Sequence, residues 1–251
     1  MAVNPLDMQG RTVLVTGASS GIGRETAILL SELDARVVLV ARNRERLEET
    51  LGRMSGEGHR IEPFDLNETD GIPDWIKRIA TDTGPLGGLV HSAGIFRVLP
   101  LQSESASRIE SLMRINLTSA IMIVKGFRRS GCALRGSGIV LLSSAAGIVG
   151  AQGISTYSAS KAALIGFTRS AALELVASGL RINCVAPGMV ETEMVDRSPQ
   201  TPEQVEAVKR THPLGLGAPR DVANAIVFLL AGTGRWITGS TLVVDGGYSA
   251  S

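Results

Sequence analysis

Short apolar runs alternate with longer amphipathic segments along the whole chain. The runs are short and rich in β-branched residues, as is typical of strands that are buried on both faces of a parallel sheet. We expect strands at residues 12–16, 37–41, 61–64, 89–91, 139–142, 181–185 and 241–244. The intervening segments carry apolar residues at helical spacing. They predict helices at 24–33, 44–54, 72–81, 107–129, 157–176 and 221–230.

Seven strands that alternate with helices predict β-α-β units joined by right-handed crossovers. The expected fold class is α/β: a single-domain Rossmann fold with a seven-stranded, parallel, doubly wound sheet and helices on both faces. No internal repeat or low-complexity linker divides the chain, so residues 1–251 are expected to form one domain. The irregular segment at about 188–216 contains proline and glycine breaks and is typical of a substrate lid.

Composition argues against several classes of function. The chain has 251 residues and a net charge of +1, so it has no general attraction to nucleic acid or to acidic membranes. Two cysteines do not make a disulfide framework, and three isolated histidines lack zinc-ligand spacing, so we expect no metal. No apolar run reaches the ~18 residues of a membrane span. Without a recognisable signal peptide, the expected location is the cytoplasm.

A glycine-rich turn joins the first expected strand to the first helix. Its three glycines follow the pattern Gly-x-x-x-Gly-x-Gly. Glycine permits a tight turn and lets the backbone approach a pyrophosphate, which the N-terminus of the following helix attracts. The turn therefore predicts a dinucleotide site formed by Gly17, Ser19, Ser20, Gly21, Ile22 and Gly23.

Two charged residues follow the next strands. Arg42 stands near the end of the second strand, where an NAD-binding protein would carry a carboxylate for the ribose hydroxyls. Its planar guanidinium suits a 2′-phosphate, although a solvated turn arginine is the alternative, so we expect NADP to be preferred with NAD possible. Asp65 follows the third strand and either accepts a hydrogen bond from the adenine amino group or caps its own turn.

The candidate chemistry lies between residues 144 and 161. Tyr157 and Lys161 are four residues apart, so a helix places them on one face, where a lysine favours the phenolate form. Ser144 ends an apolar run, and the carboxyl end of a parallel strand faces the ligand crevice. Ser144 can there hydrogen-bond a substrate oxygen while Tyr157 moves a proton. A Tyr-x-x-x-Lys pair taken alone is more often a surface pair, so the interpretation depends on the surrounding nucleotide site.

These residues resemble the short-chain dehydrogenase/reductase family in its compact single-domain branch, over nearly the whole chain. The matching positions are residues 16–23, Asp65, residues 92–94, Asn116, Ser144, Tyr157, Lys161, residues 187–192, 238–239 and 245–247. The resemblance implies that Tyr157 is the general acid/base and that Ser144 orients the substrate oxygen. Lys161 would bind the nicotinamide ribose and lower the pKa of the phenol. Asn116 would hold a water that links Lys161 to solvent.

The resemblance also implies the remaining cofactor contacts and an assembly. The further cofactor residues are Leu66, Ala93, Gly94, Pro187, Gly188, Val190 and Thr192, with the segment after residue 187 covering the nicotinamide. One departure is Ser92, which stands where the family usually has asparagine and has a shorter reach. Family members imply a homotetramer or homodimer built from helix 107–129, the Tyr157 helix and the C-terminal strand.

The substrate is less well defined by the sequence. Residues that flank the catalytic positions or lie in the expected lid are Ile95, Phe96, Ala145, Gln152, Met189, Met194 and Val195. They are mostly apolar and predict a substrate with an apolar portion, although Ile95 and Met189 could equally be core residues.

The function that the resemblance implies is an NADP(H)-dependent oxidoreductase. It would reduce a small-molecule ketone or aldehyde, or oxidise the matching secondary alcohol. A 3-oxoacyl-[acyl-carrier-protein] reductase of fatty-acid or polyketide synthesis is the alternative. Arg129 lies near one of two basic positions that hold the carrier protein in that group, and Ser178 occupies the other. A Rossmann protein that senses NADP(H) without catalysis is a remote alternative, because such proteins often lack the tyrosine or the lysine.

Overall fold

The seven expected strands form one sheet in the computed structural model, which describes residues 4–193, 206–207 and 209–250. The strands are β1 (Thr12–Thr16), β2 (Arg36–Ala41), β3 (Arg60–Pro63), β4 (Leu86–His91), β5 (Ala133–Leu142), β6 (Arg181–Pro187) and β7 (Thr241–Val244). All neighbouring pairs are parallel, in the order β3-β2-β1-β4-β5-β6-β7. The predicted doubly wound α/β fold is confirmed.

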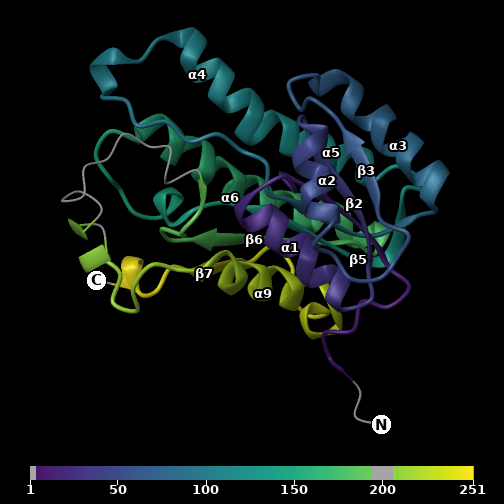
Figure 1. Cartoon of the computed structure of the whole chain (residues 1–251). Helices are drawn as coiled ribbons and strands as arrows, with labels where there is room; N and C mark the ends of the chain where they lie inside the picture. The colour runs from purple at the N-terminus through teal and green to yellow at the C-terminus, as the bar shows by residue number, and fades with distance from the viewer. Residues whose placement is uncertain (1–3, 194–205, 208, 251) are drawn as a thin grey trace.

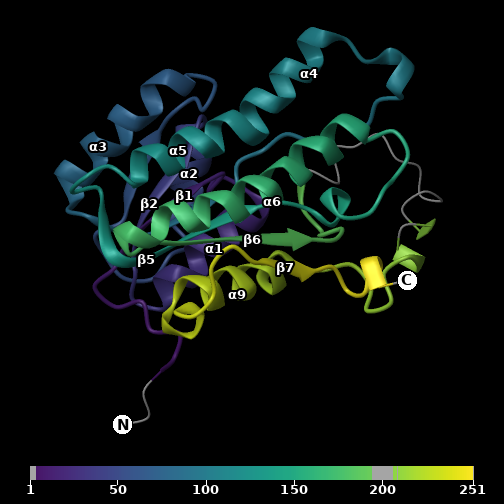
Figure 2. The same ribbon diagram turned by 180° about the vertical axis from the view of Figure 1, so that it is seen from behind.

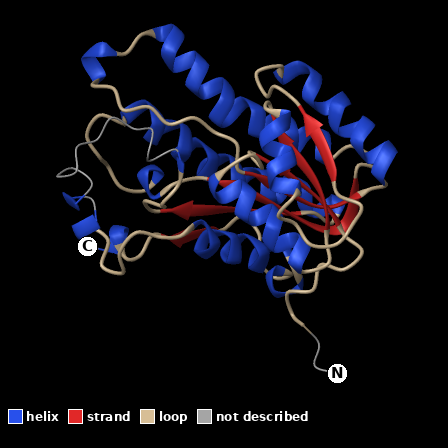
Figure 3. Ribbon diagram, in the orientation of Figure 1, coloured by secondary structure: helices blue, strands red, loops and turns tan. Residues whose placement is uncertain are grey.

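Helices cover both faces of the sheet, as Figure 3 shows. One apolar core joins the sheet to α1 (Gly21–Glu32), α2 (Arg44–Leu51) and α9 (Pro219–Leu230). A second core joins the opposite face to α3 (Ile72–Thr83), α5 (Ser119–Phe127) and α6 (Ser155–Leu175). Short 3₁₀ turns lie at Thr69–Gly71, Leu101–Ser103, Ala145–Gly147, Val176–Ser178, Gly232–Gly234 and Tyr248–Ala250.

The expected helix at 107–129 is interrupted. It consists of α4 (Ala106–Met113), a π-helical turn (Arg114–Thr118) and α5, and α4 projects away from the body of the molecule (Figures 1 and 2). A π turn inserts one extra residue into the helical repeat, often at a functional site. Here it carries Asn116.

Two strands begin several residues earlier than their apolar patterns predict, β4 by three residues and β5 by six. β4 starts at Leu86 because Gly87 and Gly88 belong to it, although neither contributes to an apolar run. A Cβ at Gly87 would lie 2.9 Å from the Cβ of Arg11, so the strand passes too close to that side chain to carry a larger residue. β5 starts at Ala133 with exposed residues, which a search for buried runs does not detect.

The strand order reverses between β1 and β4, and this reversal determines where a ligand binds. β2 and β3 continue on one side of β1, whereas β4 to β7 continue on the other. The last paired residues, Thr16 of β1 and His91 of β4, lie opposite one another at the carboxyl edge. In open α/β sheets, ligands bind in the crevice outside the carboxyl edge at such a reversal.

No helix in the described part of the chain is long and apolar enough to cross a membrane.

Candidate active site at the carboxyl edge of the sheet

Ser144 and Tyr157 face one another just beyond β5. The Ser144 hydroxyl accepts a hydrogen bond from the backbone N–H of Ala146 at 3.1 Å, which fixes the first turn after the strand. A hydrogen bond between the Ser144 and Tyr157 hydroxyls lowers the pKa of the phenol, but burial has the larger and opposite effect. The pKa of Tyr157 is therefore raised above its usual value.

Lys161 is buried one helical turn after Tyr157. Its Nζ lies 5.7 Å from the centre of the Tyr157 ring and donates a hydrogen bond to the Leu142 carbonyl at 2.7 Å. Burial lowers the pKa of Lys161 to about 8. The expected lowering of the phenol pKa by Lys161 is not found in this arrangement, because the ammonium bonds to a backbone carbonyl and burial dominates the pKa of Tyr157.

Asn116 connects the loop after β4 to α6. Its Oδ1 accepts a hydrogen bond from the Ile95 N–H at 2.8 Å, and its Nδ2 donates to the Ile95 carbonyl and to the Ser160 hydroxyl, both at 3.0 Å. Both amide hydrogens are thus used. A water at this position would have to be held by an oxygen of Asn116, either Oδ1 or the backbone carbonyl of the π turn.

Gly94 lies against both polar side chains of this cluster. A Cβ at position 94 would come within 3.3 Å of Asn116 Oδ1 and 3.5 Å of Lys161 Nζ. Contacts at the shorter distance require the neighbour to shift by a few tenths of an ångström. Glycine at this position therefore lets the loop after β4 pack directly over Asn116 and Lys161.

His91 is a site residue that the sequence analysis did not identify. The Ser119 hydroxyl donates its single proton to the Ile115 carbonyl at 2.6 Å, so it must accept from Nε2 of His91 at 3.3 Å. Nδ1 of the neutral ring is then an acceptor, and the Thr16 hydroxyl donates to it at 3.0 Å. The same Thr16 oxygen accepts from the Ala93 N–H at 3.2 Å. These bonds join β1, the loop after β4 and the segment that carries Asn116.

Burial, reinforced by the charge of Lys161, lowers the pKa of His91 to about 3. A neutral ring is required by the network, because protonation would turn Nδ1 from an acceptor into a donor facing the Thr16 hydroxyl. The loop after β4 is therefore anchored through His91 and Thr16. The parallel register of β1 and β4, which pairs these two residues, is the feature from which this role could have been found.

The glycine turn after β1 has the geometry of a phosphate cradle. Gly17 has φ +70°, and a Cβ there would lie 2.8 Å from the backbone nitrogen of Ala93. A Cβ at Gly23 would come within 2.3 Å of the Gly17 carbonyl oxygen, so the turn closes tightly on itself. Ser20 is the N-cap of α1, and its side chain makes no capping bond. The N–H groups of the first turn are therefore left to an incoming anion, which fits a pyrophosphate.

Other cofactor candidates in the first half of the chain behave differently from one another. Arg42 is exposed and forms no hydrogen bond or ion pair with another described residue, which fits a 2′-phosphate. Asp65 Oδ1 accepts from the backbone and side-chain nitrogens of Asn67 at 3.0 and 2.9 Å, so it caps its own turn. The Leu66 side chain is buried in the core, so only its backbone can reach a cofactor.

The segment after β6 returns to the glycine turn. A Cβ at Gly21 would lie 3.1 Å from Thr192 Cγ2, which places these two cofactor candidates in contact. Val190 pairs with Gly217 in an isolated bridge that fixes the segment laterally. Beyond residue 193 the expected lid passes outside the described residues, and so do Met194 and Val195.

His212 is a second residue that the sequence analysis did not assign to the site. Its Nε2 accepts a hydrogen bond from the Met189 N–H at 3.0 Å, and its ring stacks on Tyr248 with centres 4.7 Å apart. Gly188 lies so close that a Cβ would be 2.9 Å from the same Nε2. His212, which comes later in the sequence, therefore fixes the backbone just after Pro187.

Among the expected substrate residues in the described part of the chain, Phe96 contacts Tyr157 directly. The Phe96 ring meets the Tyr157 ring edge-on, with centres 4.9 Å apart. Ala145 is buried, Met189 is partly buried and Gln152 is exposed.

The two positions considered for carrier binding lie elsewhere. Arg129 follows α5 and pairs with Asp74, and the 3₁₀ turn with Ser178 precedes β6. Both therefore lie toward the amino edge of the sheet.

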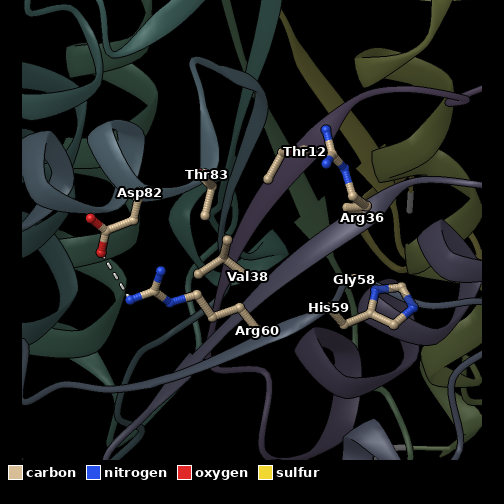
Figure 4. A pocket seen from close by; sticks show the side chains of 8 residues that line it. All are labelled: Thr12, Arg36, Val38, Gly58, His59, Arg60, Asp82 and Thr83. Atoms are coloured by element: carbon tan, nitrogen blue, oxygen red, sulfur yellow. Dashed lines mark hydrogen bonds and ion pairs between the residues drawn. The ribbon is translucent and has the colours of Figure 1, made fainter.

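A cavity of about 370 Å³ also opens at the amino edge (Figure 4). It is lined by Thr12, Arg36, Val38, Gly58, His59, Arg60, Asp82 and Thr83. Arg60 spans it and pairs with Asp82 at 3.0 Å. Among the described residues, no group of three histidines, cysteines or carboxylates is placed to hold a metal ion.

Comparison with known proteins gives consistent matches over the full fold. Residues 17–249 match the family model described as Enoyl-(Acyl carrier protein) reductase. The chain is 38% identical to carbonyl reductase family member 4 of Danio rerio over 239 residues, covering 94% of this chain and 97% of that protein. It is 32% identical to the 3-oxoacyl-[acyl-carrier-protein] reductase FabG of Thermotoga maritima over 243 residues, covering 96% and 98% of the two chains.

A solved structure extends the similarity to a cofactor complex. It is a candidate 2-deoxy-d-gluconate 3-dehydrogenase from Agrobacterium tumefaciens with bound NADP. The two structures align with a TM-score of 0.89 and 29% sequence identity, covering 99% of this chain and all of the other. The similarity therefore spans the glycine turn, the sheet and the Ser144–Tyr157 pair together.

Proposed function

Because the chain belongs to the short-chain dehydrogenase/reductase family, whose members act on CH–OH and C=O groups, we propose that it is an NADP(H)-dependent carbonyl reductase. The reaction is reduction of a ketone or aldehyde, or oxidation of the matching secondary alcohol. The observation that carries this proposal is the facing pair of Ser144 and Tyr157 hydroxyls above the buried Lys161, at the edge that also holds the glycine turn.

The side chains divide the proton chemistry among them. The bound nicotinamide supplies the hydride. Tyr157 donates its phenolic proton to the substrate oxygen as the carbonyl carbon is reduced, and Ser144 hydrogen-bonds that same oxygen. Lys161, whose pKa is about 8, stays mostly protonated at pH 7 and would bind the hydroxyls of the nicotinamide ribose beside the phenol. Asn116 and Gly94 keep the loop over Lys161 in place, and Phe96 covers one edge of the Tyr157 ring.

The cofactor preference rests on Arg42 and the helix N-terminus. The α1 terminus, without a side-chain cap, is suited to the pyrophosphate. The Arg42 guanidinium, which has no bonding partner among the described residues, is suited to a 2′-phosphate. The structural neighbour with bound NADP supports the same choice. The cofactor-binding residues proposed are those of the glycine turn, the loop after β4 and residues 187–192.

The alternative substrate is a 3-oxoacyl group carried on an acyl carrier protein, which the 3-oxoacyl-[acyl-carrier-protein] reductase relative favours. Against it, Arg129 is already paired with Asp74 at 2.5 Å, and Ser178 has no charge with which to hold an acidic carrier. A protein that only senses NADP(H) would have no use for Tyr157 and Lys161 together. We therefore place the small carbonyl compound first.

We also propose that the chain assembles into a homotetramer or homodimer through α6 and β7. Leu173 and Val176 are exposed at the end of α6, and Leu242 and Val243 are exposed on the edge strand β7. An apolar groove of about 430 Å³ lies between α6 and β7. Its lining includes Ile148, Ala162, Ile165 and Val243. An unpaired strand edge beside exposed apolar side chains is suited to a second copy. Light scattering of the purified protein measures the mass.

The proposed reaction is tested by mixing the purified protein with NADPH and a panel of carbonyl compounds. The panel contains aliphatic ketones, cyclic ketones, aldehydes and a 3-oxoacyl thioester on acyl carrier protein. We expect loss of NADPH absorbance with at least one ketone or aldehyde, at a rate proportional to enzyme. Turnover of the carrier thioester alone would select the alternative. Tight NADPH binding with no turnover of any carbonyl compound would contradict catalysis.

A further inference from the structure

Arg97 lies on the loop after β4, one residue beyond the aromatic side chain that contacts Tyr157. The loop is fixed on both sides of it: Asn116 bonds to the N–H and carbonyl of Ile95, and the Leu99 N–H donates to the Gly153 carbonyl at 2.7 Å. Arg97 is therefore carried by restrained backbone beside the candidate catalytic pair.

The Arg97 guanidinium is also distinctive among the partly buried arginines of the described residues. Every other member of that set donates at least one hydrogen bond: Arg11, Arg24, Arg46, Arg60, Arg181 and Arg220. Arg97 has the same partial burial, but no hydrogen bond or ion pair joins it to another described residue. A guanidinium that has lost part of its hydration without gaining an acceptor is poorly satisfied.

The acid nearest along the loop does not supply the missing acceptor. Glu104 has a buried carboxylate oxygen, Oε2, without a hydrogen-bond partner in the described part of the chain, and no ion pair joins Glu104 to Arg97. The loop therefore leaves a positive charge unneutralised on the residue that follows Phe96, whose ring contacts Tyr157. A ligand that carries a negative charge in addition to its reacting carbonyl would satisfy it.

We propose that Arg97 binds a carboxylate of the substrate, so that the preferred carbonyl compound is an oxo acid rather than a neutral ketone. This inference rests on the proposed carbonyl reduction and names its substrate class. The planar guanidinium can hold both carboxylate oxygens at once, which fixes the orientation of the substrate as well as its affinity. Ser144 and Tyr157 then meet the carbonyl oxygen while Arg97 holds the acid group.

A matched pair of substrates tests the assignment: 4-oxocyclohexanecarboxylate and its methyl ester, which share a ketone and differ in charge. With the wild-type protein and NADPH, we expect a higher kcat/KM for the acid. Arg97→Gln should lower kcat/KM for the acid roughly 10- to 100-fold, mainly through a higher KM. It should change kcat/KM for the ester about twofold or less. Arg97→Lys should recover part of the loss, because it restores the charge without the planar fork.

Arg108→Gln is the control variant. Arg108 is exposed on α4 and donates to the Ser103 carbonyl, so the substitution should leave kcat/KM unchanged for both the acid and the ester. Equal losses on acid and ester in Arg97→Gln, or a wild-type preference for the ester, would overturn the assignment and leave carbonyl reduction intact. Failure of the wild-type protein to reduce either compound or any member of the carbonyl panel would overturn both proposals.

Discussion

The two edges of the sheet both carry charged side chains, but they satisfy those charges differently. At the amino edge, Arg60 pairs with Glu62 and Asp82, and Arg78 pairs with the same two carboxylates. At the carboxyl edge, Lys161 is buried with a backbone carbonyl as its hydrogen-bond partner. Burial displaces the pKa values of Lys161 downward and of Tyr157 upward.

The difference shows which physical property identifies the candidate site. The amino edge has a cavity, and two of the charged side chains that line it, Arg60 and Asp82, pair with one another (Figure 4). The carboxyl edge holds buried ionisable groups whose pKa values have moved from their usual range, and such groups concentrate where chemistry occurs. Buried groups with shifted pKa values near the glycine turn therefore identify the candidate site better than the size of a cavity does.

The largest expected effect breaks the chemistry at the carboxyl edge. Tyr157→Phe removes the proton donor and keeps the ring, so kcat/KM should fall about 100- to 10,000-fold. The affinity for NADPH, measured by titration calorimetry, should change about twofold or less. Arg36→Gln alters the amino-edge cavity instead and should leave turnover unchanged. A Tyr157→Phe variant that kept a tenth or more of wild-type turnover would contradict the assigned role.

The next effect concerns the cofactor end of the same edge. Arg42→Asp removes the proposed partner of the 2′-phosphate and supplies a carboxylate suited to the ribose hydroxyls of NADH. The ratio of NADPH to NADH affinity should shift toward NADH by roughly 100-fold, because charge-assisted contacts are both lost and gained. Arg44→Gln, on a neighbouring exposed arginine that pairs with Glu48, is the control. An unchanged ratio would remove the NADP assignment.

The smallest expected effect is on stability in acid. The pKa of His91 is about 3 in the folded protein and about 6.5 when unfolded, so the unfolded chain binds more protons between these values. Stability should therefore fall as the pH falls, by about 2 kcal/mol between pH 7 and pH 5 from this residue. Urea denaturation of the wild type and of His91→Asn measures the difference. Parallel pH profiles for the two proteins would contradict a buried neutral His91.

Much of the fold could be predicted because the buried strands carry their own apolar pattern. β1 and β7 have the predicted boundaries, since their ends coincide with the ends of the apolar runs. The apolar pattern did not predict those parts of the elements that depend on close backbone packing or on contacts with distant residues. Gly87 and Gly88 extend β4 without apolar side chains, and the π turn around Asn116 depends on bonds to a distant loop at Ile95.

The candidate site was predictable only in part, for a related reason. Tyr157 and Lys161 occur at a spacing that local helical geometry explains, and Ser144 follows an apolar run that predicts a strand. The structure brings the three together. His91 and His212 act through partners far away in sequence, at Thr16 and Met189, so no local spacing reveals them. Arg97 was missed because what distinguishes it is the absence of a bonding partner among described residues, which only a folded structure can show.

The most direct test of the central claim is to follow the hydride itself. The wild-type protein is given NADPH carrying deuterium at both C4 positions of the nicotinamide, together with a ketone that it consumes, and the alcohol product is analysed by mass spectrometry. The account predicts one deuterium on the carbinol carbon, and the same label at a greatly reduced rate with Tyr157→Phe. A product without deuterium would contradict hydride transfer at the carboxyl edge of the sheet.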